Sequence, residues 1–250
     1  MKRKINFKEK LEKLENFLFD PHVCICCNYE CDLDNSYRLC SKCVDKLNFI
    51  GNQYCLKCGD KIGDGYDFCI NCKETSYNFD CSRSVICYDE ISSPIIQRFK
   101  YNGQKMYAIP LAYMLNDYYV ESDITANVVT YVPMPKDRQK ERGYNQAEEL
   151  AKEFCKLSKL PLFDLLTRKT GTTKQSTLTA KERRENIKGN FTLINKAKVK
   201  NKDILLIDDV STTGSTTNEC AKVLKKGGAR TVSVLTVCKT PREYNMLKEQ

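Results

Sequence analysis

ILLIDDVSTTGSTTNECAKVLKKGGA is the sequence of residues 204–229, and this stretch decides the fold of the chain. The apolar run at its start predicts a buried strand, and two acids, Asp208 and Asp209, follow where that strand ends. A turn of small hydroxyl residues comes next, and then a helix over about 216–226 that ends at two glycines. A strand, a polar turn and a helix in this order are typical of open α/β folds, whose ligands collect at the carboxyl edge of the sheet.

The turn at residues 211–216 favours a phosphate ligand. Its backbone N–H groups and hydroxyls can point at an anion, and the helix that follows adds partial positive charge at its N-terminus. Asp208 and Asp209 would repel a phosphate, so we expect them to face neutral hydroxyls, as on a ribose, or a metal ion. The loop therefore suits a sugar phosphate better than a bare phosphate. It lacks the Gly-Lys-Ser/Thr ending of a Walker-type nucleotide loop.

Apolar patterns predict the other elements of this half: strands at 127–132 and 231–237, and helices at 93–120 and 145–157. Gly103 and Pro110 are expected to break the first of these helices. Alternating strands and helices predict an α/β domain over residues 85–250, with a mainly parallel sheet flanked by helices on both faces.

Two segments of this half are rich in basic residues. The first follows the strand at 127–132 and is expected to bring four of them to the same sheet edge: Lys136, Arg138, Lys140 and Arg142. The second, residues 168–186, is long and polar and contains Lys169, Lys174, Arg183 and Arg184. A single lysine here would be typical of a solvated surface, but the clusters together predict anion binding, and the first suits a pyrophosphate.

The N-terminal half contains four Cys-x-x-Cys pairs: Cys24 with Cys27, Cys40 with Cys43, Cys55 with Cys58, and Cys69 with Cys72. Two intervening residues let both sulfurs of a pair reach one tetrahedral ion. Joining the pairs in sequence order predicts two structural zinc sites in a double zinc ribbon over residues 21–80, although interleaved pairing also fits the spacing. Cys26 and Cys31 are spare, and either could replace a ligand of the first pair, Cys24 above all. A thioredoxin-like dithiol is disfavoured, because it needs one pair at the start of a helix.

The charge of the chain is uneven. Residues 1–90 hold 13 basic against 15 acidic residues, and the remainder holds 28 against 17, so the formal net charge of +9 comes from the C-terminal part. An anionic ligand is therefore expected in that part.

The sequence also indicates in which cellular compartment the protein is expected. No apolar run approaches the ~18 residues that a membrane-spanning helix needs, and the basic N-terminus lacks the apolar stretch and cleavage site of a secretory signal. We expect a cytoplasmic protein without membrane insertion. Residues 1–20 predict one amphipathic helix, with Leu11, Leu14, Phe17 and Leu18 spaced three and four apart, that packs on a neighbouring domain or partner.

The segment at 204–229 resembles the signature of type I phosphoribosyltransferases. By position, the resemblance implies that Asp208 and Asp209 hold the ribose hydroxyls, and it assigns the 5-phosphate to Ser211, Thr212, Thr213, Gly214, Ser215 and Thr216. Ser211 departs from the signature, which usually has an apolar residue there. A cysteine-rich region is followed by two further segments, YVPMPKDRQKERGYNQAEELA at 131–151 and RKTGTTKQSTLTAKERRENIKGNF at 168–191. With this order of segments, nearly the whole chain resembles the ComF family of competence-associated proteins.

These resemblances imply a ligand and a reaction. The ligand would be phosphoribosyl pyrophosphate (PRPP) or ribose 5-phosphate, with Mg²⁺ bridging the pyrophosphate and the ribose hydroxyls. Lys136, Arg138 and Arg142 would join the substrate-binding residues. Residues 168–186 resemble the lid that closes over the substrate in this fold. That similarity makes Lys174 and Arg183 the predicted catalytic partners of Asp208 and Asp209 in a pentosyl transfer.

The acceptor of such a transfer is not evident from the sequence. Residues 87–120 are the expected acceptor-binding hood, whose tyrosines could stack on a base but more often pack a core: Tyr101, Tyr107, Tyr113, Tyr118 and Tyr119. His22, the one histidine of the chain, lies beside the cysteine pairs and is not expected to act as a base. The ComF resemblance implies a role in natural transformation, with single-stranded DNA and competence proteins as partners. A non-catalytic PRPP sensor or single-stranded-DNA-handling protein is the alternative.

Overall fold

The computed structural model describes residues 22–30, 36–101, 104–169, 187 and 189–241 of the 250-residue chain. The predicted helix at 1–20 lies outside the described residues, and so do Lys174 and Arg183. No helix in the described ranges is both long enough and apolar enough to cross a bilayer.

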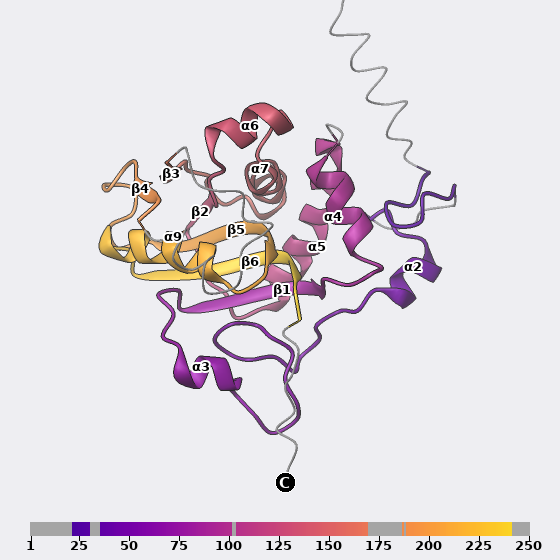
Figure 1. The fold of residues 1–250 in the computed structure, drawn as a ribbon, viewed down its shortest axis with the longest axis horizontal. Coiled ribbons are helices and arrows are strands. Elements are labelled where there is room, and N and C mark those ends of the chain that lie inside the picture. Colours follow the sequence, from indigo (N-terminus) through magenta and orange to yellow (C-terminus); the bar gives the residue numbers. More distant parts are fainter. Residues whose placement is uncertain (1–21, 31–35, 102–103, 170–186, 188, 242–250) are drawn as a thin grey trace, which may run out of the picture.

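A four-stranded sheet forms the centre of the C-terminal half, as Figure 1 shows. All its neighbouring strands are parallel, and their order across the sheet is β1 (Cys81–Cys87), β6 (Thr231–Lys239), β5 (Asp203–Ser211) and β2 (Val128–Tyr131). The mainly parallel sheet expected from the sequence is therefore confirmed.

Helices cover both faces of this sheet. Alternate side chains of β5 explain the layering, because Leu205 and Ile207 pack into one apolar core and Ile204 and Leu206 into the other. The first core contains residues of α4 (Ser93–Lys100), α5 (Ala108–Glu121) and α7 (Gln146–Ser158). The second contains residues of α9 (Ser215–Lys226). A strand buried on both faces is expected to be apolar throughout, as 204–207 is.

The remaining elements are short. They are the 3-10 helix η1 (Lys105–Tyr107), α6 (Lys136–Arg142) and an antiparallel hairpin of β3 (Leu166–Arg168) and β4 (Phe191–Leu193). The segment expected to be a lid connects the two strands of this hairpin.

Three local predictions need correction. Pro110 does not break a helix, because it lies in the first turn of α5, where a missing N–H removes no intrahelical bond. The stretch KDRQKER is the helix α6, which the sequence did not predict. The sheet also begins at Cys81, before residue 85, where the α/β domain was expected to start. The serines of β1 are buried, and the Ser84 hydroxyl hydrogen-bonds that of Thr236 at 2.6 Å.

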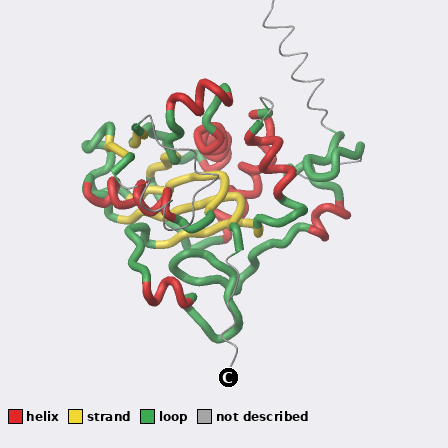
Figure 2. The backbone as a smooth tube through the Cα atoms, in the orientation of Figure 1, coloured by secondary structure: helices red, strands yellow, loops and turns green. Residues whose placement is uncertain are grey.

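The cysteine-rich region is mostly loop, with the short helices α2 (Ser41–Lys46) and α3 (Ile70–Glu74), as Figure 2 shows. Its first part packs into the core that contains α5, and its second part packs into the core that contains α9. The connection between the two parts runs along the free edge of β1, where Phe49 bridges Ile86 and the Ile50 N–H donates to the Val85 carbonyl. The cysteine-rich region thereby covers an edge strand that would otherwise be exposed.

Candidate functional site

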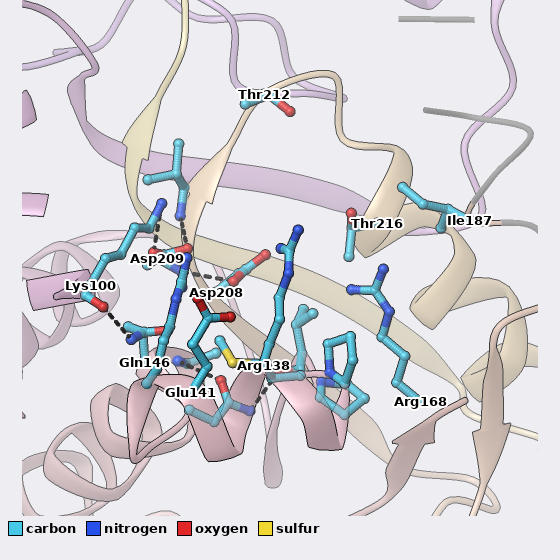
Figure 3. A pocket seen from close by; sticks show the side chains of 18 of the residues that line it. Lys100, Arg138, Glu141, Gln146, Arg168, Ile187, Asp208, Asp209, Thr212 and Thr216 are labelled. Atoms are coloured by element: carbon cyan, nitrogen blue, oxygen red, sulfur yellow. Dashed lines mark hydrogen bonds and ion pairs between the residues drawn. The ribbon is translucent and has the colours of Figure 1, made fainter. Parts of the chain in front are cut away.

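A pocket of about 530 Å³ opens at the carboxyl ends of β2 and β5. The helix α7, the second helix after β2, packs on one face of the sheet, and α9, which follows β5, packs on the other. The pocket therefore lies at the switch point where open α/β folds bind ligands. Its polar lining, drawn in part in Figure 3, combines acids, bases and hydroxyls: Lys100, Arg138, Glu141, Arg142, Asn145, Gln146, Arg168, Asp208, Asp209, Thr212, Thr213 and Thr216.

The two acids are held by the backbone of their own strand. Asp208 Oδ1 accepts a hydrogen bond from the Asp209 N–H at 2.9 Å, and Asp209 Oδ1 accepts one from the Val210 N–H at 2.8 Å. The second oxygen of Asp209 forms an ion pair with Lys100 Nζ at 3.0 Å. Carboxylates fixed in this way are preorganised to receive hydroxyls or a cation.

Asp208 has a strongly altered acidity. Burial of its carboxyl group and the neighbouring charge of Asp209 raise the pKa of Asp208 well above its usual range. The unliganded pocket therefore disfavours two full negative charges at this position. A ligand that donates hydrogen bonds, or a cation, would stabilise the charged form of Asp208.

The hydroxyl-rich turn leads directly into α9. Gly214, the N-cap residue of α9, has a left-handed backbone (φ 73°) and no side chain to cap the helix, and the Thr213 hydroxyl accepts a hydrogen bond from the Ser215 N–H at 3.4 Å. The hydroxyls of Thr213 and Ser215 lie 2.7 Å apart, and Thr216 lines the pocket in the first turn of α9. An uncapped helix start of this kind can bind an anion.

Arginines form the wall opposite the turn. Figure 3 shows the Arg138 side chain extending between Asp208 and Thr216 in that view, and the Arg168 guanidinium lying below Thr216. Arg168 is 9% exposed, its Nε has no hydrogen-bond partner, and its guanidinium lies over the ring of Phe191 at 5.3 Å. Among the described residues, neither arginine has an ion-pair partner. Because an unpaired buried cation is unfavourable, an anion is the ligand that this wall would stabilise.

The eight paired cysteines form two clusters in sequence order: Cys24, Cys27, Cys40 and Cys43, and then Cys55, Cys58, Cys69 and Cys72. All sulfurs within each cluster lie within 4.8 Å of one another. A tetrahedral zinc with Zn–S bonds of about 2.3 Å separates its sulfurs by about 3.8 Å. The observed separations are 3.9 Å between Cys27 and Cys40 and 3.6 Å between Cys58 and Cys69. The residues therefore fit two zinc ions, the interleaved pairing is wrong, and Cys26 is not part of the first cluster.

Comparison with known proteins also divides the chain into a cysteine-rich N-terminal part and a C-terminal α/β part. Residues 140–249 match the family described as phosphoribosyl transferase domain, and residues 14–75 match the double zinc ribbon domain. Competence protein F of Haemophilus influenzae is 33% identical over 203 residues, which cover 78% of this chain and 88% of that protein. The chain belongs to the ComF family.

Further proteins are similar to this chain. Competence protein ComFC of Bacillus subtilis is 26% identical and covers 87% of this chain and 95% of its own length. DNA utilization protein YhgH of Escherichia coli is 26% identical and covers 88% and 98%. Among solved structures, the glutamine PRPP amidotransferase of B. subtilis aligns with 50% of this chain and 25% of its own, at 20% identity and a TM-score of 0.36.

The structure of this ComF-family chain brings most of the predicted pocket residues together. Asp208, Asp209, Thr212, Thr213, Thr216, Arg138 and Arg142 all line the pocket. Lys136 does not, because in the helix α6 residues 138 and 142 share one face and Lys136 is exposed on another. Ser211 is buried behind the turn, whereas Gly214 and Ser215 belong to the turn without lining the cavity.

Two lining cations were missed in the sequence, Lys100 and Arg168. Each ends a short element, α4 or β3, whose place beside the pocket depends on long-range packing. The segment 87–120 is not a hood as a whole, since α5 packs against α7 and the sheet. Of the five tyrosines considered as base-stacking residues, Tyr101 lines the pocket, and its ring lies under the Arg142 guanidinium at 5.1 Å.

Proposed function

We propose that the pocket binds PRPP with Mg²⁺ and that the protein is a phosphoribosyltransferase whose acceptor is still to be identified. The observation that carries this proposal is that one cavity brings together an acid pair, a hydroxyl-rich turn at a helix start, and two arginines, Arg138 and Arg168, that form no ion pair with any described residue. A ribose that carries a phosphate at one end and a pyrophosphate at the other matches all three.

Different residues of the pocket would contact different parts of PRPP. The turn from Thr212 to Thr216 would hold the 5-phosphate, and Asp208 and Asp209 would accept hydrogen bonds from the ribose hydroxyls. Arg138 and Arg168 would neutralise the pyrophosphate as the C1–O bond breaks and its electrons pass to the leaving group. We propose Lys174 and Arg183 as further contacts from the segment between β3 and β4.

The acid pair also suits a divalent cation. Carboxylate oxygens are the protein ligands that Mg²⁺ prefers. Asp208 has one oxygen beyond the one that its backbone holds, and the second oxygen of Asp209 is the one paired with Lys100. When bound, Mg²⁺ would supply positive charge to the pyrophosphate.

Turnover tests this function directly. The protein would be incubated with PRPP, Mg²⁺ and a panel of bases and amines, and pyrophosphate release would be measured. We expect release by the wild type and by Asp203→Asn, which makes the same chemical change at the other end of β5, but not by the Asp208→Asn, Asp209→Asn variant. Equal release by all three proteins would contradict the assignment of the pocket.

A second candidate is a binding protein that uses the same pocket as a sensor or clamp. The names of the relatives favour it, since they refer to competence and DNA utilization rather than to a transferase. We therefore propose a role in DNA uptake, and tight binding of PRPP without pyrophosphate release would support the clamp.

Single-stranded DNA binding would be an additional property of that candidate. The excess of 28 basic over 17 acidic residues beyond residue 90 supports phosphate contacts. Affinity for an oligonucleotide should then fall steeply as salt is added. An affinity that does not change with salt would argue against phosphate contacts.

A further inference from the structure

A buried ion pair connects the second cysteine cluster to the back of the phosphate-binding turn. Lys239, the last residue of β6, is 2% exposed, and its Nζ lies 3.2 Å from Asp60 Oδ1. The same ammonium group donates to the Cys58 carbonyl at 3.3 Å and to Ser211 Oγ at 3.4 Å. One buried cation thus contacts a zinc-ligand residue and the residue that begins the turn.

The chain that follows the second cluster also supports the turn. The Tyr77 hydroxyl donates to the Thr213 carbonyl at 3.5 Å, and the Asn78 N–H donates to Asn218 Oδ1 in α9 at 2.6 Å. Tyr77 and Phe79 are stacked at 4.8 Å, and a Cβ on Gly214 would lie 3.7 Å from the first ring and 3.8 Å from the second. The rear surface of the turn therefore rests on residues of the cysteine-rich region.

Electrostatics explains why a lysine is buried at this position. Four thiolates around one Zn²⁺ carry a net charge of about −2, and the Asp60 carboxylate lies beside this cluster, 3.3 Å from Cys58 Sγ. Lys239 offsets that negative charge. Removing one partner of a buried ion pair is strongly unfavourable, so loss of the lysine alone would leave the charge of Asp60 beside an already negative cluster.

We propose that Lys239 is a positioning residue through which the second zinc ribbon fixes the turn for phosphate binding. The inference deepens the proposed function and rests on it, because the ligand is the same sugar phosphate. Lys239 contacts the turn from behind and not the ligand, so its effect is transmitted through Ser211 and the backbone that follows.

Calorimetric titration with ribose 5-phosphate tests the inference. Lys239→Met should weaken the affinity about tenfold, which is within the range for residues that act through a packed neighbour. Arg230→Met is the matched control, because it removes a cation that pairs with Asp203 at the opposite, amino end of β5 and β6. The control should bind ribose 5-phosphate like the wild type.

A double variant separates positioning from folding. Replacing a buried ion pair by apolar residues is often neutral for stability, whereas removing one partner is not. Lys239→Met, Asp60→Leu should therefore melt near the wild-type temperature and keep two zinc ions per chain, yet bind ribose 5-phosphate as weakly as Lys239→Met. Wild-type affinity in the double variant would overturn the inference.

If wild-type protein bound no ribose 5-phosphate, that result would contradict the proposed function. Amide hydrogen exchange would still test the positioning role of Lys239, because it needs no ligand. Amides of residues 211–216 should exchange faster in the double variant than in the wild type, while those of β2 should not. Unchanged exchange at 211–216 would overturn the positioning role by itself.

Discussion

Lys100 and Asp209 form an ion pair inside the pocket, with Lys100 Nζ 3.0 Å from Asp209 Oδ2. The pair joins the last residue of α4 to β5. Burial alone would lower the pKa of Lys100, but the charge of Asp209 and its hydrogen bond raise it, so the ammonium form is stabilised. Lys100 therefore offsets the negative charge of Asp209, one of the two acids in the pocket. A phosphorylated ligand is proposed to bind beside these acids.

Loss of this cation should weaken the binding of anions. We expect Lys100→Met to reduce the affinity for PRPP by about tenfold or more, since a hydrogen bond to a charged group contributes about 1.5–3 kcal/mol. Titration calorimetry would measure it, with Lys105→Met as a control, because Lys105 is exposed and does not line the pocket. Equal affinities in the two variants would show that Lys100 has no part in binding.

Asp208 should lower the stability of the unliganded protein. Its pKa is raised by folding, so the folded state holds a proton that the unfolded state releases above about pH 3.9, and stability falls as pH rises above that value toward the folded pKa. Asp208→Asn removes this effect. The variant should melt at a higher temperature than the wild type at pH 7, with a smaller difference at pH 5, and should not bind ribose 5-phosphate.

Melting curves at the two pH values would check this prediction. A variant that melts below the wild type at pH 7, or a difference that does not depend on pH, would contradict the account of Asp208.

Arg168 should contribute to affinity without contributing to stability. Its guanidinium is buried and has no ion-pair partner among the described residues, so Arg168→Met should not lower the melting temperature. The affinity for PRPP should fall about tenfold or more, and Arg168→Lys should retain part of it. Lys105→Met, at an exposed position outside the pocket, is again the control. If PRPP bound Arg168→Met as it binds the wild type, the arginine wall would not be an anion site.

The metal content distinguishes the cysteine ligands from the spare cysteine. Elemental analysis should find about two zinc ions per chain. Cys24→Ser should lose one of them, whereas Cys26→Ser should keep both, because Cys24 belongs to the first cluster and Cys26 does not. Protein purified without zinc, or loss of zinc from the Cys26 variant instead, would contradict the ligand set.

Local patterns were enough to predict the turn and the zinc clusters, because their residues are close in sequence. The acid pair, the hydroxyls and the start of α9 lie within one short segment, and so do the two cysteines of each pair. Lys100 and Arg168 could not be predicted in this way, since α4 and the β3–β4 hairpin reach the pocket through long-range packing.

Two errors have local causes. Lys136 and Arg138 were treated alike because the seven residues of α6 have no apolar stripe to indicate a helix, and helical geometry then separates their side chains. The strand β1 was missed because its serines are buried, which becomes possible when a partner such as Thr236 supplies the hydrogen bond.

A crystal structure of the protein soaked with ribose 5-phosphate and Mg²⁺ tests the central claim most directly. We predict the phosphate within hydrogen-bond distance of the backbone N–H groups between Thr212 and Thr216, and the ribose hydroxyls against Asp208 and Asp209. A sugar phosphate bound elsewhere, with those amides turned away from it, would contradict the account.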